Sequence, residues 1–284
     1  KELTLAHLDH GLRPEGSQEM LWVKHFAAER GIACITDRSP VGELAATHKR
    51  GIEDTARQSR YQFFLKVARE QSLKKLVLAH HADDQIETLI FRLLRGSGVN
   101  GLTAMAQKSE RHCGDTTLTI LRPMLAIWRH EIDVYIQNRG LLFLEDPSNA
   151  TDDFTRNRIR HSLIPEMERI MRRPVRESLW RASELLRAEA DFVAAAETSL
   201  GKLSQHLQVS DLKRLPLALL RRRIAGWLAL QGVSNISYDL VESVCRLVLR
   251  TVPSKVNLPK NAHVRRKAGR IFIETADPNA AKNF

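Results

Sequence analysis

Short apolar runs alternate with amphipathic segments through the first half of the chain. Each run is four or five residues long and ends in polar or turn-forming residues, which is typical of buried strands. Between the runs, apolar side chains such as Tyr61, Leu65 and Ala68 recur every three or four positions and predict helices. The predicted strands are 4–8, 32–35, 76–79 and 117–121, and the predicted helices are 17–30, 53–71, a segment that starts near 83, and 129–139.

This alternation indicates an α/β fold in which helices cover both faces of a parallel sheet. After Pro165 the pattern changes to long helical segments. The later predicted elements are helices 177–200, 217–230 and 238–250, then hairpin strands 255–258, 262–266 and 270–274. We therefore expect an α/β domain over residues 1–165, connecting helices over 166–203, and a smaller, mainly helical domain over 204–284 that ends in the hairpin.

Composition restricts the class of protein further. The chain has 284 residues, of which 43% are hydrophobic, so wholesale disorder is excluded. No apolar run approaches the roughly 20 residues that a membrane span requires, so we expect a cytoplasmic protein with no membrane partner. Cys34, Cys113 and Cys245 are too scattered for a disulfide framework or a Cys-x-x-Cys metal site.

The positive charge is concentrated at the C-terminal end. The formal net charge is +11, and residues 201–284 hold 15 basic against 5 acidic side chains. Such a segment favours a polyanion such as nucleic acid, although a solvated basic surface is the alternative. The candidate RNA-binding residues are Arg221, Arg222, Arg223, Arg265, Arg266 and Lys267, with Arg156, Arg158 and Arg160 earlier in the chain.

Two clusters of polar residues follow predicted strands. Asp9-His10 comes after the first strand, and residues 80–84, with sequence His-His-Ala-Asp-Asp, come after the third. The carboxyl ends of parallel strands usually form the ligand site. Asp84, Glu87 and Thr88 share one helix face, which could hold Mg²⁺ and a polyphosphate or recognise an amine. The alternative is that the aspartates only stabilise the helix N-terminus.

Three further motifs have both a functional and a structural interpretation. Arg95-Gly96-Ser97-Gly98 could bind an anion through backbone N–H groups, or could cap a helix. Arg57 could contact phosphate, or could form an i,i+4 pair with Glu53. The arginines at 156, 158 and 160 could bind phosphate, or could lie at a solvated helix end.

Taken together and in this order, the motifs resemble the tRNA(Ile)-lysidine synthetases, a family of N-type ATP pyrophosphatases (PP-loop enzymes). The similarity covers roughly residues 4–165, and the segment from Leu215 to Lys267 more loosely resembles the helical domain that follows in that family. The matching residues are Ala6-His7-x-Asp9-His10-Gly11-Leu12-Arg13, Ile52-Glu53-x-x-Ala56-Arg57-x-x-Arg60-Tyr61, Ala79-His80-His81-x-Asp83-Asp84-Gln85-x-Glu87-Thr88, Arg95-Gly96-x-Gly98-x-x-Gly101-Leu102, Arg122-Pro123-Met124-Leu125, and Asp146-x-Ser148-Asn149 followed by Arg156-Asn157-x-x-Arg160.

The resemblance implies an adenine nucleotide alpha hydrolase-like fold, ATP and Mg²⁺ as cofactors, and ligation of lysine to the wobble cytidine of CAU-anticodon isoleucine tRNA through an adenylated intermediate. It implies free L-lysine and that tRNA as partners, and is compatible with a homodimer. The catalytic candidates are Asp84, Glu87 and Arg95, with Asp84 also the metal ligand and Glu87 the partner of lysine. The nucleotide-binding candidates are Asp9, His10, Arg57, His80, His81 and Gly96.

One feature departs from this family. Its Ser-Gly-Gly-x-Asp-Ser loop, which binds pyrophosphate and should precede residues 3–8 by one helix, is not in the sequence, which begins at Lys1. We expect that the natural protein continues upstream and that a protein beginning at Lys1 makes no lysidine.

Two other function classes stay open at this point. One is a non-catalytic RNA-binding protein built on a decayed PP-loop domain, which the absent loop and the basic tail favour. The other is a different PP-loop tRNA-modifying enzyme, such as a thiolase or an amidotransferase-coupled synthetase. Thiolases of this kind use paired cysteines, and Cys34, Cys113 and Cys245 offer no such pair.

Overall fold

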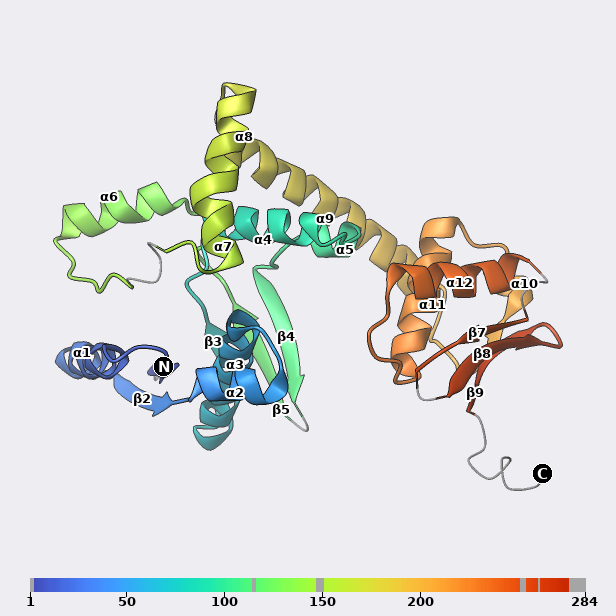
Figure 1. Ribbon diagram of the computed structural model, residues 1–284, viewed down its shortest axis with the longest axis horizontal. Helices are drawn as coiled ribbons and strands as arrows, with labels where there is room; N and C mark the ends of the chain where they lie inside the picture. The colour runs from blue at the N-terminus through green and yellow to red at the C-terminus, as the bar shows by residue number, and fades with distance from the viewer. Residues whose placement is uncertain (1–2, 114–115, 147–150, 251–253, 260, 276–284) are drawn as a thin grey trace. The chain divides into compact units, whose positions relative to one another are not determined.

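The computed structural model describes residues 3–113, 116–146, 151–250, 254–259 and 261–275 (Figure 1). The chain divides into two compact units, Lys1–Arg187 and Ala188–Phe284. The motif residues Ser148 and Asn149 lie outside the described ranges. Within these ranges, no helix is both long enough and apolar enough to cross a lipid bilayer.

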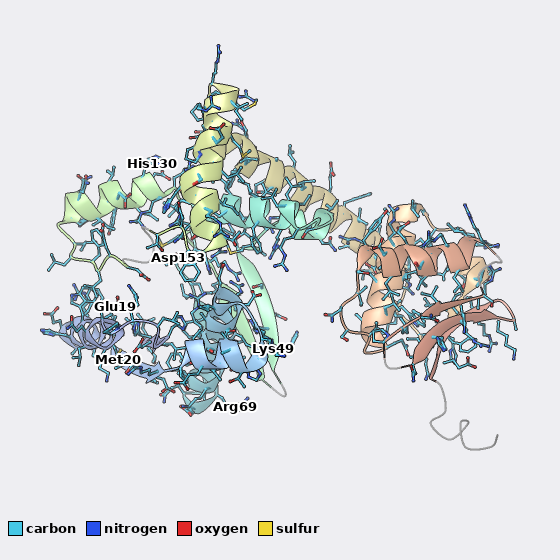
Figure 2. All side chains as sticks on the ribbon, in the orientation of Figure 1. Glu19, Met20, Lys49, Arg69, His130 and Asp153 are labelled. Carbon is cyan, nitrogen blue, oxygen red and sulfur yellow. The ribbon has the colours of Figure 1, made fainter. Side chains whose placement is uncertain are left out.

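The first unit opens with a parallel β–α–β arrangement, as predicted. Strand β1 (Thr4–Asp9) pairs with β2 (Ala33–Arg38), and helix α1 (Gly16–Glu29) connects them and packs against both. Helix α2 (Val41–His48) was missed, because it is short and only two of its residues are buried. It ends at Lys49, labelled in Figure 2, whose φ of 51° is the left-handed conformation common after a helix.

A second sheet follows, in the order β3 (Lys75–Val77), β5 (Thr116–Leu121), β4 (Lys108–Cys113). Strands β3 and β5 are parallel, as predicted, but β4 runs antiparallel to β5 and was not predicted. The sequence of β4 is largely polar, so it lacks the apolar alternation of a half-buried strand. Only two residues separate β4 from β5, and so short a connection permits only antiparallel pairing.

Helix α3 (Ile52–Glu70) contacts both sheets. It packs against β1, β3 and β5, and its Leu65 and Ala68 form a small core with the fully buried Leu118 of β5. The predicted periodicity of this helix is therefore confirmed. Because α3 lies along both sheets, its basic residues come close to the ends of strands from each of them.

The remaining helices of the first unit gather around α4 (Ala82–Leu94). Helix α7 (Thr155–Arg158) continues as a π-helical turn, η2 (Ile159–Leu163), and as α8 (Ile164–Met171), and both α7 and η2 contact α4. An apolar core joins Ile86 and Ile90 of α4 to Ile159, Ile164 and Val175. The other elements are α5 (Val99–Leu102), α6 (Arg129–Arg139) and the start of α9 (Arg176–Ser199).

The second unit is a helical layer on an antiparallel sheet. The sheet has the order β6 (Leu207–Gln208), β9 (Arg270–Thr275), β8 (Ala262–Lys267), β7 (Lys255–Asn257), so the predicted hairpin is part of a four-stranded sheet. The helices are α10 (Val209–Leu212), α11 (Leu217–Leu230) and α12 (Tyr238–Leu249), and α12 packs on β7 and β8. Their shared core includes Trp227, Leu228, Val264 and Ile271.

Two leucines of α11 test whether this core holds the second unit together. Leu228 is fully buried, whereas Leu230 is 59% exposed. We expect Leu228→Ala to lower the free energy of unfolding by about 3 kcal/mol, because it leaves a cavity, and Leu230→Ala to lower it by less than about 1 kcal/mol. Urea titrations followed by circular dichroism measure both, and equal losses would contradict the described packing.

Candidate active site at the start of helix α4

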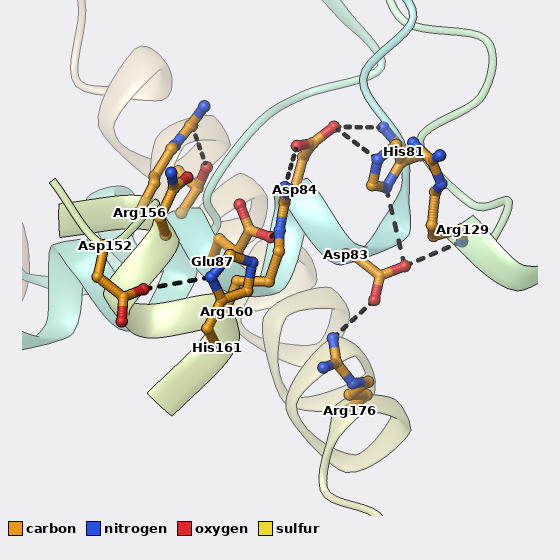
Figure 3. A network of polar contacts seen from close by, with 12 residues as sticks. His81, Asp83, Asp84, Glu87, Arg129, Asp152, Arg156, Arg160, His161 and Arg176 are labelled. Atoms are coloured by element: carbon orange, nitrogen blue, oxygen red, sulfur yellow. Dashed lines mark hydrogen bonds and ion pairs between the residues drawn. The ribbon is translucent and has the colours of Figure 1, made fainter. Parts of the chain in front are cut away.

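Polar residues of α4 itself determine where that helix begins. His81 is the N-cap residue, and its backbone N–H donates to Asp84 Oδ2 at 2.9 Å in a capping box. The alternative that the aspartates stabilise the helix N-terminus therefore holds for Asp84, whose side chain is part of the capping box. Its Oδ1 lies 3.8 Å from Arg160 Nη2, so the other side of the carboxylate faces a cation (Figure 3).

Asp83 connects α4 to two other helices. Its Oδ1 accepts from Arg176 Nη1 of α9 at 2.7 Å, and its Oδ2 accepts from the backbone N–H of Arg129 of α6 at 3.0 Å (Figure 3). His81 Nδ1 lies 3.7 Å from the same Oδ2. With one oxygen on Arg176 and the other on the backbone N–H of Arg129, Asp83 acts as a structural junction between these helices.

Glu87 is the most deeply buried acidic group of this site. Its side chain has no exposed surface, and its Oε1 accepts from Arg160 Nε at 2.6 Å. Burial raises the pKa of Glu87, while the hydrogen bond from Arg160 opposes that shift. Glu87 Oε2 has no hydrogen-bond partner among the residues described. A buried carboxylate oxygen without a donor is an unsatisfied acceptor, and a ligand with an N–H group would satisfy it.

A face of α7 and η2 lies opposite this face of α4. Arg156 Nη2 donates to Thr88 Oγ1 at 3.0 Å, and Arg160, one turn later, contacts Glu87 and Asp84 (Figure 3). Asp84, Glu87 and Thr88 thus share one face, as the spacing predicted. Arg160 lies in the π-helical turn, a kind of local distortion that is frequent at functional sites.

The histidines of the two strand ends are poor bases in this environment. Burial lowers the pKa of His80 to about 4, and nearby Arg122, Arg156 and Arg60 add to this, while Asp84 opposes it. Burial also lowers the pKa of His10, with Arg60 again contributing. Because the Arg60 guanidinium group lowers the pKa of both imidazoles, it lies near the residues that follow β1 and near those that follow β3. Both rings are therefore neutral at pH 7 and able to accept a hydrogen bond.

Several arginines crowd this region. Burial lowers the pKa of Arg60, and Arg57 and Arg156 lower it further. Burial likewise lowers the pKa of Arg92, with contributions from Arg57, Arg156 and Arg122. Cations that repel one another in a half-buried site favour binding of an anion, and phosphate groups match guanidinium geometry well. Arg60 and Arg122 belong to the matched motifs but, like Arg92, were not among the predicted site residues, because a single arginine in a helix or loop looks like a solvated charge.

One predicted nucleotide ligand, Asp9, is used by the fold itself. Asp9 is buried, its Oδ1 accepts from the backbone N–H of Gly11 at 2.8 Å, and its Oδ2 lies 3.3 Å from Arg38 Nε. A Cβ atom at Gly16 would lie 2.3 Å from Asp9 Oδ1, so the start of α1 can approach this carboxylate only at a glycine. Asp9 therefore holds the loop after β1 in place, beside His10.

The glycine motif at the other end of α4 caps the helix. Gly96 has a φ of 74°, and the N–H groups of Gly96 and Ser97 donate to the carbonyl oxygens of Leu93 and Arg92. Arg95 stacks on the Phe91 ring at 5.2 Å. Eleven residues of helix separate Arg95 from Asp84, a rise of about 16 Å. The structure thus does not bring Arg95 and Gly96 to the carboxylates.

Most of the predicted RNA-binding arginines make contacts within their own unit. Arg221 pairs with Glu242 at 2.5 Å, and Arg265 pairs with Glu274 at 2.7 Å. Other guanidinium groups donate to backbone carbonyls: Arg158 to Asp152 and Asp153, Arg223 to Leu200, Gly201 and Lys202, and Arg266 to Leu247, Val248 and Arg250. Lys267 is exposed at the end of β8.

The donor set fits a nucleotide-borne Mg²⁺ better than a metal cage built by the protein. In the ranges that the structure describes, no group of three or more His, Cys, Asp or Glu side chains could hold a metal ion. Magnesium is commonly bound by one or two carboxylates together with substrate phosphates. Asp84 Oδ1 is the carboxylate oxygen that could serve in this way, next to arginines suited to the phosphates.

Residues 1–167 match the family profile of the PP-loop domain. The chain belongs to the PP-loop family. Residues 207–272 match the TilS substrate binding domain. The motif resemblance is therefore confirmed, together with the predicted fold of a PP-loop domain followed by a smaller domain.

Curated relatives of this PP-loop chain are longer than it is. It is 36% identical to the tRNA(Ile)-lysidine synthase of Geobacter sulfurreducens, over 93% of the chain and 57% of that protein. It is 33% identical to the synthase of Geobacillus kaustophilus, over 100% of the chain and 62% of that protein. It is 34% identical to the bifunctional protein TilS/HprT of Listeria innocua, over 99% of the chain and 44% of that protein. The chain thus spans roughly half the length of these relatives.

A solved structure supports the PP-loop fold alone. The U34-tRNA thiolase NcsA from Methanococcus maripaludis, with its [4Fe-4S] cluster, superposes with a TM-score of 0.52 at 15% identity. The superposition covers 66% of this chain and 63% of the thiolase.

The pair formed by Glu87 and Arg160 can be tested by a double-mutant cycle. Arg160→Ala should destabilise the protein by about 3 kcal/mol, because it leaves a buried carboxylate without its cation. Adding Glu87→Gln should recover part of that loss, with a coupling energy of about 2 kcal/mol. Arg158→Ala, a neighbouring exposed arginine, is the control and should change stability by less than about 0.5 kcal/mol. Additive effects in chemical denaturation would contradict the pairing.

The low pKa of His80 predicts a specific pH dependence. Its folded-state pKa of about 4 lies below the unfolded value of roughly 6.5, so the unfolded state binds its proton first. Stability should therefore fall as pH decreases from 6.5 towards 4, and His80→Gln should reduce that slope. Nitrogen-15 NMR of the ring should show a neutral imidazole at pH 6, and a midpoint near 6.5 for His80 would refute the assignment.

Proposed function

We propose that this chain is the catalytic and first tRNA-binding part of a tRNA(Ile)-lysidine synthase, acting in the cytoplasm. One observation carries the proposal: a buried carboxylate, Glu87, keeps one oxygen on Arg160 and the other without a donor, beside a half-buried cluster of arginines. Such a site can hold an amine and a phosphate group next to each other. The similarity to tRNA(Ile)-lysidine synthases supports lysine as the amine and an isoleucine tRNA as the RNA.

The reaction has two steps whose atoms balance. The C2 oxygen of the wobble cytidine attacks the α-phosphorus of ATP, which forms the C2–O–AMP linkage and releases pyrophosphate. The side-chain amine of free lysine then attacks C2, the C2–O bond breaks, and AMP leaves with that oxygen. The amine loses a proton in this step, so a base must be close to it.

The nucleotide side of the site is built from neutral imidazoles and guanidinium groups. His10 and His80 are half-buried, the Nδ1 atom of each ring is buried with no partner among the described residues, and the rings can accept from or donate to the nucleotide. Arg60 on α3 lies near both, Arg57 lies near Arg60, and the two guanidinium groups can neutralise the phosphates as negative charge develops. Mg²⁺, held by Asp84 together with the phosphates, would supply further charge neutralisation.

The lysine side is built on Glu87 of α4. Glu87 binds the lysine ammonium group. The charges of Arg160 and Asp84 fix the position of the Glu87 carboxylate. Burial raises the pKa of Glu87, which makes it a stronger proton acceptor than a solvated glutamate. Arg160 accordingly serves as a positioning residue for Glu87. This assignment gives Arg160 a different role from the phosphate contact expected from its position among the arginines of 156–160.

The complete protein should incorporate labelled lysine into CAU-anticodon isoleucine tRNA in the presence of ATP. Asp84→Asn and Glu87→Gln should each reduce turnover by roughly 10³-fold or more, since each removes charge from the reacting groups, with little change in tRNA affinity. Glu70→Gln, an exposed glutamate at the end of α3, is the matched control and should keep wild-type turnover.

The outcomes separate the candidate functions. RNA binding without lysine incorporation or pyrophosphate release by the complete protein would favour the non-catalytic RNA-binding alternative. Wild-type turnover of Asp84→Asn or Glu87→Gln would show that the carboxylate roles are wrong even if the protein makes lysidine.

A further inference from the structure

The sheet of the second unit has a face that the described helices do not cover. Alternate residues of a strand point to opposite faces. Val264 and Ile271 face α11 and α12 and are fully buried in the core. The residues beside them, Arg265 and Phe272, therefore point to the opposite face, and neither belongs to the core cluster.

Pairing across the strands arranges this open face as a grid. In one row, Lys255 pairs with Arg265, which pairs with Phe272. In the next row, Lys267 pairs with Arg270, which pairs with Gln208. The His206 ring lies 6.2 Å from the Phe272 ring at 90°, so two rings meet edge to face beside four cations. We call these residues the open sheet face: His206, Lys255, Arg265, Lys267, Arg270 and Phe272.

The cations of this face differ from the other basic residues of the unit. Arg266 binds carbonyl groups at the end of α12 and so caps that helix, whereas Arg223 binds carbonyl groups of the segment that follows α9. Lys255, Lys267 and Arg270 are exposed and have no ion-pair partner within the described ranges. Glu274 is the acidic side chain of this face, and it pairs with Arg265 at 2.7 Å. The face thus carries an unbalanced positive charge that does not serve the fold.

We propose that the open sheet face binds an unpaired segment of RNA, with a base stacked on Phe272 and the flanking phosphates on Lys255, Lys267 and Arg270. Stacking on an aromatic ring requires a base that is free of its own stack, and the exposed cations on neighbouring positions of the sheet can contact the phosphates that flank it. Duplex RNA would use the cations but not the ring. A lipid surface or an acidic peptide would gain nothing from a half-buried ring in the middle of a polar sheet.

This inference rests on the proposed function in one respect, that the RNA is the tRNA substrate. A folded tRNA presents unpaired bases in its loops and at its 3′ end. The match to a TilS substrate binding domain covers the sheet as far as residue 272, but does not identify which surface makes contact. The rings and cations of the open sheet face are the surface that we propose for this contact.

The test measures binding of the whole chain to three fluorescent RNAs by anisotropy: the isoleucine tRNA transcript, a single-stranded heptamer and a blunt duplex. Phe272→Leu keeps an apolar side chain but removes the ring, and should weaken heptamer binding roughly 10-fold while leaving duplex binding unchanged. Phe192→Leu is the matched control, because Phe192 is a 75% exposed phenylalanine of the same unit on α9. Thermal melts establish that both variants are folded.

Salt dependence tests the phosphate contacts separately. Replacing Lys255, Lys267 and Arg270 with serine should reduce the slope of log affinity against log salt for the heptamer by about 2, because each lost contact removes roughly 0.7 of a released counterion. The control triple replaces Lys202, Lys213 and Arg214, which are exposed in the same unit outside the sheet, and should leave that slope unchanged. An unchanged slope in the first triple variant would overturn the proposal.

Lysine incorporation by the complete protein distinguishes failure of this inference from failure of the proposed function. Phe272→Leu should raise the KM for tRNA with kcat unchanged, since the ring contacts RNA away from the reacting atoms. If lysidine forms but Phe272→Leu behaves like Phe192→Leu with every RNA, the open sheet face is not an RNA site. If no lysidine forms but binding of the heptamer still depends on Phe272, the RNA site on the open sheet face is supported and the proposed function is wrong.

Discussion

The ion pair between Glu87 and Arg160 is the interaction on which the rest of the first unit depends. A carboxylate with no exposed surface is costly unless a cation and hydrogen bonds compensate it, and Arg160 provides both at 2.6 Å. The same helix α4 presents Ile86 and Ile90 to the core that includes Ile159 and Ile164. Apolar packing and the ion pair therefore impose the same arrangement of α4, α7 and η2. This arrangement leaves Glu87 Oε2 without a donor and places the arginine cluster beside it.

Local pattern was sufficient to predict the elements whose residues alternate or repeat clearly. Helix 217–230 and the strand beginning at 262 follow the apolar periodicity, and Asp84, Glu87 and Thr88 share a face because helical spacing requires it. Strand β4 carries no such pattern, since its register depends on β5. The partner of Glu87 lies 73 residues away, and no local feature distinguishes Arg160 from Arg158. Contacts of this kind depend on tertiary packing, which a single sequence does not reveal.

The positive charge of the chain has more than one physical role. Part of it binds backbone carbonyl groups, at the end of α12 for Arg266 and after α9 for Arg223, and this part contributes to stability whether or not RNA is present. Part of it crowds the half-buried site of the first unit, where Arg57, Arg60 and Arg156 repel one another until an anion binds. A third part, at Lys255, Lys267 and Arg270, lies exposed on a sheet. Net charge predicts a polyanionic partner, but only the hydrogen bonds show which cations remain able to meet one.

Glu87 is proposed to serve the amine, whereas Asp84, the arginines and the histidines are proposed to serve the nucleotide. The most direct test is to measure, with the complete protein carrying Glu87→Gln, pyrophosphate release from ATP and tRNA alongside transfer of labelled lysine. Pyrophosphate release in the first turnover should stay within about threefold of wild type while lysine transfer is lost. A parallel loss of both steps would contradict this division of roles, because Glu87 would then serve the nucleotide as well.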